Sequence, residues 1–223
     1  MTAFAPGTDR GRPGTATASG EEAYPSPLWT NRRQGPGSSR KQALSWAHRF
    51  CDEWGVERFE ESVSSADPDG LRLVRDRGPA GLEIAAGEYG FVLRDFTELL
   101  GAVGCLQADV TRCGGITGLL EVAGAAAAHH VDVSAHCAPA VTAHAFRGVR
   151  RLRHAEYFHD HVRIEHRAFD GVTEVRRGRL RCDPDWPGLG LRVRWPDVEP
   201  FRVDAQGGAD GPARRTASRP GAR

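Results

Sequence analysis

The apolar positions in the middle of the chain follow two alternating periods. Short runs that are continuously apolar or alternate every second residue predict strands, and the stretches between them carry apolar residues at steps of three and four, which is typical of amphipathic helices. Strands are expected at 56–61, 81–88, 104–109, 131–136 and 153–158. Helices are expected at 39–54, 67–77, 91–101 and 139–149, and one more follows the turn at Gly114-Gly115. Strict alternation of this kind predicts a parallel sheet, either doubly wound or closed into a (β/α)₈ barrel.

Local signals mark where several of these helices begin and end. Ser39 with Gln42 forms a capping box, and Gly55 ends the helix that follows. Asp67 followed by Pro68 opens the next helix, with the acid as the cap and proline in the first turn. The predicted order of elements therefore rests on end signals as well as on periodicity.

The number of strands limits the fold class. About five are expected, whereas a closed barrel needs eight, and nothing before Ser39 resembles the other three. We therefore predict an α/β fold: a partial (β/α)₈ TIM-type barrel, about the last five βα units, over 39–203. Residues 159–203 are expected to be irregular, with strand-like stretches at 189–195 and 201–203. Residues 1–38 and 204–223, rich in Gly, Pro, Ser and Arg, are expected to be disordered tails.

Composition and charge exclude several classes of function. The net charge of +1 gives no reason to expect nucleic acid or an anionic membrane as a partner. The chain has neither a long apolar run nor a secretory signal, so no membrane association is expected. Its five cysteines include no C-x-x-C pair, which favours a reducing, cytoplasmic location over a disulfide or zinc framework.

Ionisable residues recur where the predicted strands end. In parallel α/β folds the carboxyl ends of successive strands meet at one rim, where the working residues gather. An aspartate beside a histidine at such a rim is a general-base arrangement, because the carboxylate orients the ring and stabilises its cation. The residues in question are Glu60, Glu88, Asp109 and His136 at strand ends, with Glu156 near the end of the last strand.

Two weaker features leave alternatives open. Four histidines cluster at 154, 159, 161 and 166, and the run His159-Asp160-His161 could bind a metal, although a polar loop at the rim is the simpler interpretation. Cys137, next to His136, could act as a thiol nucleophile, but a small buried residue is the interpretation that we favour.

Several motifs then occur in the order and spacing of one known family. Between about Ser39 and Val203 the chain resembles the barrel domain of the enolase superfamily, of the mandelate racemase and muconate lactonizing enzyme type, which includes many sugar-acid dehydratases. The motifs are FEE followed by SVSS, IAAGEYG, LQADVTRCGGITG, SAHCAPA, LRHAEYFHDH and DPDWPGLGL.

The resemblance implies roles for the residues at the rim. Glu60 and Glu88 match two of the three acids that bind Mg²⁺ in that family. Asp109 and His136 match its Asp–His dyad, with His136 as the base, and Glu156 matches the acid that hydrogen-bonds the substrate carboxylate. The implied reaction is Mg²⁺-assisted removal of the proton α to the carboxylate of a small acid, with acid-sugar dehydration as the expected outcome.

The chain also departs from the family pattern. The third metal acid would fall near Arg33, no Lys-x-Lys strand is present, and Ser62 replaces the usual proline after the paired acids. These departures suggest an N-terminally truncated protein, with a frame-shifted gene start as one explanation. The alternatives are a catalytically inactive fragment or a half-barrel interaction module. In either case the chain could form a homo-oligomer. With one base, dehydration is favoured over two-base racemisation.

Overall fold

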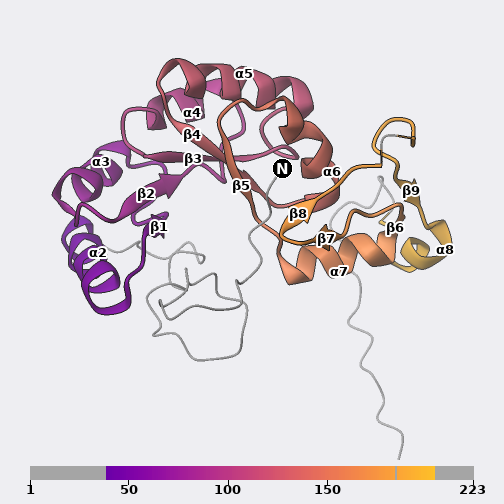
Figure 1. Ribbon diagram of the computed structural model, residues 1–223, viewed down its shortest axis with the longest axis horizontal. Helices are drawn as coiled ribbons and strands as arrows, with labels where there is room; N and C mark the ends of the chain where they lie inside the picture. The colour runs from indigo at the N-terminus through magenta and orange to yellow at the C-terminus, as the bar shows by residue number, and fades with distance from the viewer. Residues whose placement is uncertain (1–38, 184, 204–223) are drawn as a thin grey trace, which may run out of the picture.

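Five parallel strands form the centre of the molecule. The computed structural model describes residues 39–183 and 185–203, and its main sheet has the strand order β1-β2-β3-β4-β5, so neighbours in the sequence are neighbours in the sheet (Figure 1). The strands are β1 (Arg58–Glu60), β2 (Glu83–Ala86), β3 (Cys105–Asp109), β4 (Asp132–His136) and β5 (Leu152–Ala155). This sequential parallel order confirms the predicted partial TIM-type barrel.

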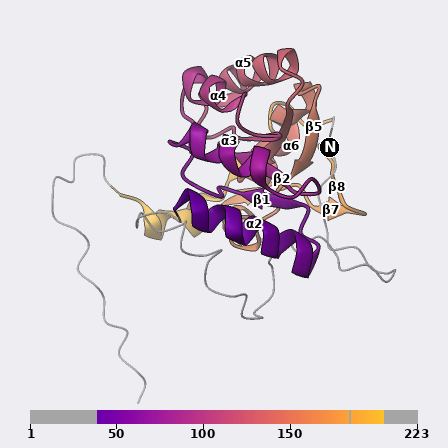
Figure 2. The same cartoon turned by 90° about the vertical axis from the view of Figure 1, so that its left-hand side faces the viewer.

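A helix follows the return path between successive strands. Figures 1 and 2 show these helices along the outer side of the curved sheet. They are α2 (Arg40–Trp54) before β1, then α3 (Pro68–Arg77), α4 (Leu93–Leu99), α5 (Gly115–Ala128) and α6 (Pro139–Ala145), the last continued by the 3₁₀ turn η1 (Phe146–Gly148). Among the described residues, no helix has both the length and the apolar character needed to cross a bilayer.

The predicted end signals operate as expected. Ser39 and Gln42 make both hydrogen bonds of the capping box, and Gly55 ends α2 in the left-handed conformation that glycine adopts without strain. The Asp67 side chain accepts a hydrogen bond from the backbone N–H of Gly70, and Pro68 occupies the first position of α3. Both helices therefore begin where the sequence places them.

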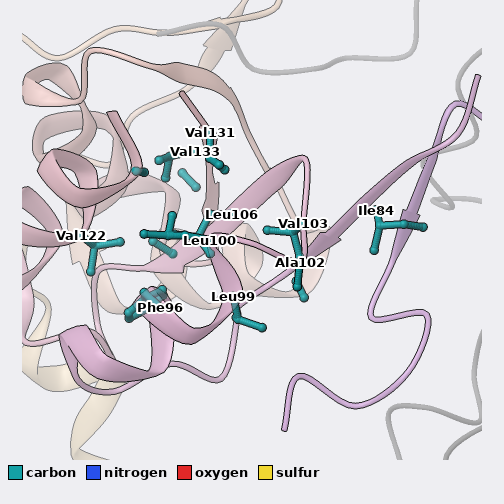
Figure 3. Packing of buried hydrophobic residues seen from close by; sticks show 14 of the residues in the cluster. Ile84, Phe96, Leu99, Leu100, Ala102, Val103, Leu106, Val122, Val131 and Val133 are labelled. Carbon is teal, nitrogen blue, oxygen red and sulfur yellow. The ribbon is translucent and has the colours of Figure 1, made fainter. Parts of the chain in front are cut away.

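Alternate residues of each strand face the helices and form one apolar core. Phe59, Ile84, Leu106 and Val133 are buried in it. Figure 3 shows how residues of α4 and α5, among them Phe96, meet this face of the sheet. Burial of this continuous apolar surface is the main stabilising contribution to the fold.

The remaining strand residues line the opposite, concave face, and they are largely polar. Arg58 on β1 donates a hydrogen bond from Nη2 to Oγ of Ser134 on β4, at 3.0 Å, and also contacts the ring of His154 on β5. One guanidinium therefore reaches from the first strand to the fourth and fifth. This contact is possible only because the sheet curves as part of a barrel does.

The C-terminal part differs from the prediction. Residues 159–168 were expected to be irregular but form α7 (His159–Ala168). The strand predicted at 189–195 is limited to β9 (Arg192–Val193), which pairs with β6 (Phe169–Asp170), and the segment 201–203 contains no strand. The remaining elements are the hairpin β7 (Val175–Arg176) and β8 (Arg179–Leu180), the short helix α8 (Trp195–Val198) and the 3₁₀ turn η2 (Glu199–Phe201). The predictions for the two tails lie outside the described residues.

Candidate active site at the carboxyl ends of the strands

The five residues singled out from the sequence lie at one end of the sheet. Glu60, Asp109 and His136 are the last residues of β1, β3 and β4. Glu88 lies two residues beyond the end of β2, and Glu156 directly follows β5 rather than lying within it, because that strand ends at Ala155. Parallel strands thus bring their carboxyl ends to the same rim, as expected.

His136 and Asp109 form a hydrogen-bonded pair. They are register partners at the end of the β3–β4 ladder, and Nδ1 of His136 lies 3.2 Å from Oδ2 of Asp109. Burial raises the pKa of Asp109, but hydrogen bonds from His136 and Thr111 outweigh burial and hold it below its ordinary value. The carboxylate therefore stays charged and keeps the hydrogen of the imidazole on Nδ1.

The other ring nitrogen of His136 faces two more acids. Nε2 lies 3.1 Å from Oε2 of Glu88 and 3.9 Å from Oε2 of Glu156. Burial lowers the pKa of His136, but the hydrogen bonds to Asp109, Cys137 and Glu88 and the charge of Glu156 dominate and raise it to about 12. The surrounding carboxylates therefore favour the protonated ring. The neutral form, with its hydrogen on Nδ1, carries the lone pair on Nε2 and is the form that can accept a proton there.

Within the described part of the chain, Glu156 has one carboxylate oxygen hydrogen-bonded to a neighbour and one without such a partner. Its Oε1 accepts a hydrogen bond of 3.0 Å from the side-chain amide of Gln107, whereas its buried Oε2 has no hydrogen-bond partner among the described residues. Burial, followed by the charge of nearby Glu60, raises its pKa. A buried oxygen without a partner at the rim is consistent with a group that awaits a ligand.

Glu61 is a residue of the rim that the sequence reasoning missed. Its carboxylate accepts hydrogen bonds of 3.1 Å from the backbone N–H groups of Gly87 and Ser65. Burial, with the charges of Glu88 and Glu60 adding to it, raises its pKa to about 7. Glu61 therefore holds the turn that carries Glu88 against β1; the second acid of the FEE motif is the signal that could have identified it.

The acids at the rim suit a hard divalent cation. Mg²⁺ prefers carboxylate oxygens, and Glu60 and Glu88 supply them at neighbouring strand ends. The negative charges of both residues raise the pKa of Glu156, which indicates that the three acids share one region. Arg58 lies 3.7 Å from Oε2 of Glu60 and offsets part of this charge. The donor chemistry of the rim is therefore compatible with the Mg²⁺ predicted from the sequence, and the assignment of Glu60 and Glu88 as its ligands stays a prediction.

The histidine cluster does not form the rim loop that we predicted. His154 lies in β5 against Arg58, whereas His159, His161 and His166 belong to α7. Cys137 is buried, as expected, and its Sγ lies 3.4 Å from Nε2 of His136.

Fold and rim together define a barrel-type α/β domain with an acid–imidazole pair among clustered carboxylates. The chain belongs to the family described as enolase C-terminal domain-like, of the mandelate racemase and muconate lactonizing enzyme type, which matches residues 30–198.

Similar proteins with known names or structures lie in the same family. The chain is 29% identical over 159 residues to the L-rhamnonate dehydratase of Saccharopolyspora erythraea, covering 66% of this chain and 39% of that enzyme. A mandelate racemase/muconate lactonizing enzyme-like protein from Rubrobacter xylanophilus is 55% identical with a TM-score of 0.71, over 74% of this chain and 46% of that one.

A third relative carries ligands. The structure of an enolase from Bradyrhizobium complexed with magnesium and mandelic acid is 27% identical, with a TM-score of 0.68, over 76% of this chain and 45% of that one. The chain thus spans less than half the length of each of these three relatives.

Proposed function

We propose that this domain removes the proton α to the carboxylate of a small acid with the assistance of Mg²⁺, and that the reaction is dehydration of an acid sugar. The observation that carries the proposal is the position of His136, whose Nδ1 is paired with Asp109 while Nε2 faces the other acids of the rim. The similarity of the chain to an L-rhamnonate dehydratase, and to an enolase whose structure contains magnesium and mandelic acid, supports this substrate class.

Each side chain of the pair has a distinct task. Asp109 accepts the hydrogen of Nδ1, so the neutral form of the ring carries its lone pair on Nε2, where it would take the proton from the α-carbon. When the hydroxyl on the adjacent carbon departs, the protonated Nε2 can return a proton to it, so that water leaves. The enol product then becomes a 2-keto acid by tautomerisation in solution.

The acids of the rim have two further roles, binding the metal and binding the substrate carboxylate. Glu60 and Glu88 would hold Mg²⁺, which when bound neutralises the charge that develops on the substrate carboxylate. The raised pKa of Glu156 favours its protonated form, so that its partnerless Oε2 can donate a hydrogen bond to the substrate carboxylate. Binding and orienting the acid would thus fall to Glu156, near the two proposed metal ligands.

The presence of one base favours elimination over racemisation. Two-base racemisation needs a second proton acceptor across the substrate, and Lys41, the only lysine of the chain, lies on α2 rather than at a strand end. Proton removal and proton return by His136 alone are sufficient for loss of water.

Deuterium exchange tests the proposal directly. The purified chain with Mg²⁺ is incubated in D₂O with C5 and C6 aldonic acids, including L-rhamnonate, and proton NMR follows loss of the α-proton and appearance of the 2-keto acid. We expect His136→Asn to slow both by at least about 10²-fold, because general-base catalysis contributes on that scale. The matched control is His166→Asn, on the exposed side of α7.

Two outcomes would contradict the proposal. One is exchange that continues at the same rate after His136→Asn, and the other is exchange that is unaffected when EDTA removes divalent cations. Loss of activity in the control variant to the same extent would show that the effect is not specific to the base.

A further inference from the structure

The thiol of Cys137 lies close to two imidazoles, one of which belongs to the proposed base. The chain turns sharply after β4, where Cys137 and Ala138 adopt φ values of 57° and 40°, a conformation that residues other than glycine rarely adopt. This turn places Sγ of Cys137 3.4 Å from Nε2 of His136 and 3.9 Å from Nε2 of His161 on α7. Strain at a turn is retained only where the surroundings enforce it, which marks this position for attention.

We propose that His136, Cys137 and His161 form a site for a thiophilic divalent cation such as Zn²⁺, and that its occupation blocks the base. The first half of the proposal stands on the arrangement of the donor atoms alone. The second half, inhibition, rests on the proposed function.

The observed separations match metal coordination. Zn²⁺ binds thiolate sulfur at about 2.3 Å and imidazole nitrogen at about 2.0–2.1 Å in a tetrahedral site, which places the two donors about 3.5 Å apart. The distances from Sγ of Cys137 to the two histidine nitrogens, 3.4 and 3.9 Å, lie on either side of that value. His136 and Cys137 are thus already spaced for a shared ion, and His161, on the first turn of α7, would approach as the third donor.

The surroundings orient and support these donors. Asp109 accepts the hydrogen of Nδ1 of His136, the partner that metal-binding histidines usually have on their other nitrogen. Among the described residues, the donor atoms that lie within 4.8 Å of one another are those of Asp109, His136 and Cys137, so His161 would have to move closer to join them. The ring of Phe158 packs against both His136 and His161, with centroids 5.6 and 5.4 Å away, so both imidazoles contact the same aromatic ring.

This proposed site and the neighbouring acids prefer different cations. Thiolate and imidazole favour Zn²⁺, whereas carboxylates favour Mg²⁺, so the two ions would occupy adjacent positions at the rim. Binding of Zn²⁺ releases the thiol proton of Cys137 to solvent and engages the lone pair of Nε2 on His136. That lone pair is the one that would accept the α-proton, and inhibition follows.

Cobalt provides a readout that is independent of catalysis. The purified chain, with its thiols kept reduced by a phosphine, is titrated with Co²⁺, and we expect a thiolate-to-cobalt charge-transfer band that saturates at one ion per chain and disappears when Zn²⁺ is added. Cys137→Ala should abolish the band, and His161→Ala should weaken Co²⁺ binding by about 10-fold or more, on the scale known for metal-site partners. His161 is only partly buried, so its variant does not depend on the tolerance of the core.

The control is Cys182→Ala, a partly buried thiol of the C-terminal segment, which should leave the band unchanged. Persistence of the band in Cys137→Ala, its loss in the control, or its absence from the parent protein would overturn the site. The two halves of the proposal are separable: a Co²⁺ band without any deuterium exchange would keep the site and reject the proposed function. Where exchange occurs, Zn²⁺ should suppress it, and added Mg²⁺ should not restore it.

Discussion

The two nitrogens of His136 face different chemistry. Nδ1 lies against Asp109, and Nε2 lies among Glu88, Glu156 and the thiol of Cys137. Strand periodicity was sufficient to predict which acids share this rim, because parallel strands fix the end of the sheet at which they lie. The contacts of Cys137 depend on the left-handed geometry of a turn, and the role of Glu61 depends on its hydrogen bonds to a neighbouring turn. Periodicity predicts neither of them. Whether the five predicted residues carry out catalysis stays a prediction.

His154 provides a test at the scale of one residue, on the concave face and away from the proposed chemistry. Burial, followed by the positive charges of Arg58 and Arg153, lowers its pKa to about 4 from an ordinary 6.5. The folded state therefore holds the ring neutral, while the unfolded chain binds a proton below pH 6.5. Stability should rise as the pH increases from about 4 to 6.5 and then level off.

We expect His154→Gln to flatten this part of the stability profile. Between about pH 4 and 6.5, the free energy of unfolding of the parent protein should rise by about 1–2 kcal/mol more than that of the variant, after allowance for solvent screening of a partly exposed group. Urea unfolding at pH 4.5, 5.5 and 7 measures it. His166→Gln, on the exposed face of α7, is the control, and an equal slope for the His154 variant and the parent protein would refute the assignment.

At the scale of elements, α7 is the helix that the periodicity did not reveal. Its sequence, HDHVRIEHRA, has no apolar stripe, and the residue that it buries is Glu165. The signals for a helix were electrostatic instead: Asp160 in the first turn and His166 with Arg167 in the last complement the helix dipole. A helix that packs through a buried carboxylate is not predicted from the spacing of apolar residues.

Glu165 attaches α7 to the start of α6. The backbone N–H of Ala140 donates to both carboxylate oxygens, each at 3.2 Å, and α6 has no side-chain cap of its own. We expect Glu165→Ala to lower the free energy of unfolding by about 1–3 kcal/mol, because a buried N–H loses its acceptor. Chemical denaturation monitored by circular dichroism measures the change.

Glu165→Gln is the matched comparison. It keeps an oxygen for Ala140 and removes a carboxyl whose pKa burial has raised. Its stability at neutral pH should lie much closer to that of the parent protein. Equal losses for the alanine and glutamine variants would show that packing, rather than the hydrogen bond, joins the two helices.

At the scale of the whole molecule, the order of strands and helices was predictable, whereas their extents and the C-terminal segment were not. Each observed strand is shorter than its predicted run: for example, 81–88 was expected and β2 covers Glu83–Ala86. Apolar runs continue past the last ladder hydrogen bond because residues that flank a strand are buried too. The small pairs β6–β9 and β7–β8 depend on contacts between segments distant in sequence, which no local pattern encodes.

Binding of Mg²⁺ should be measurable as stability of the entire fold. A ligand that binds only the folded state at ten times its dissociation constant adds about 1.4 kcal/mol, or a few degrees in melting temperature for a domain of this size. We expect Mg²⁺ to raise the melting temperature and Glu88→Gln to remove most of that rise. Glu57→Gln, an exposed acid just before β1, is the control. A Mg²⁺ effect that is the same in both variants would exclude Glu88 as a ligand.

The ladder between β3 and β4 runs without interruption from the pair Cys105 and Asp132 to the pair Asp109 and His136. Side chains alternate between the two faces of the sheet. Deletion of one residue inside either strand would therefore turn its rim residue toward the helices and an apolar neighbour toward the concave face. Packing and chemistry would be lost in the same event. Changes of length in related genes are therefore expected in the connections between elements, while these two strands keep their residue count.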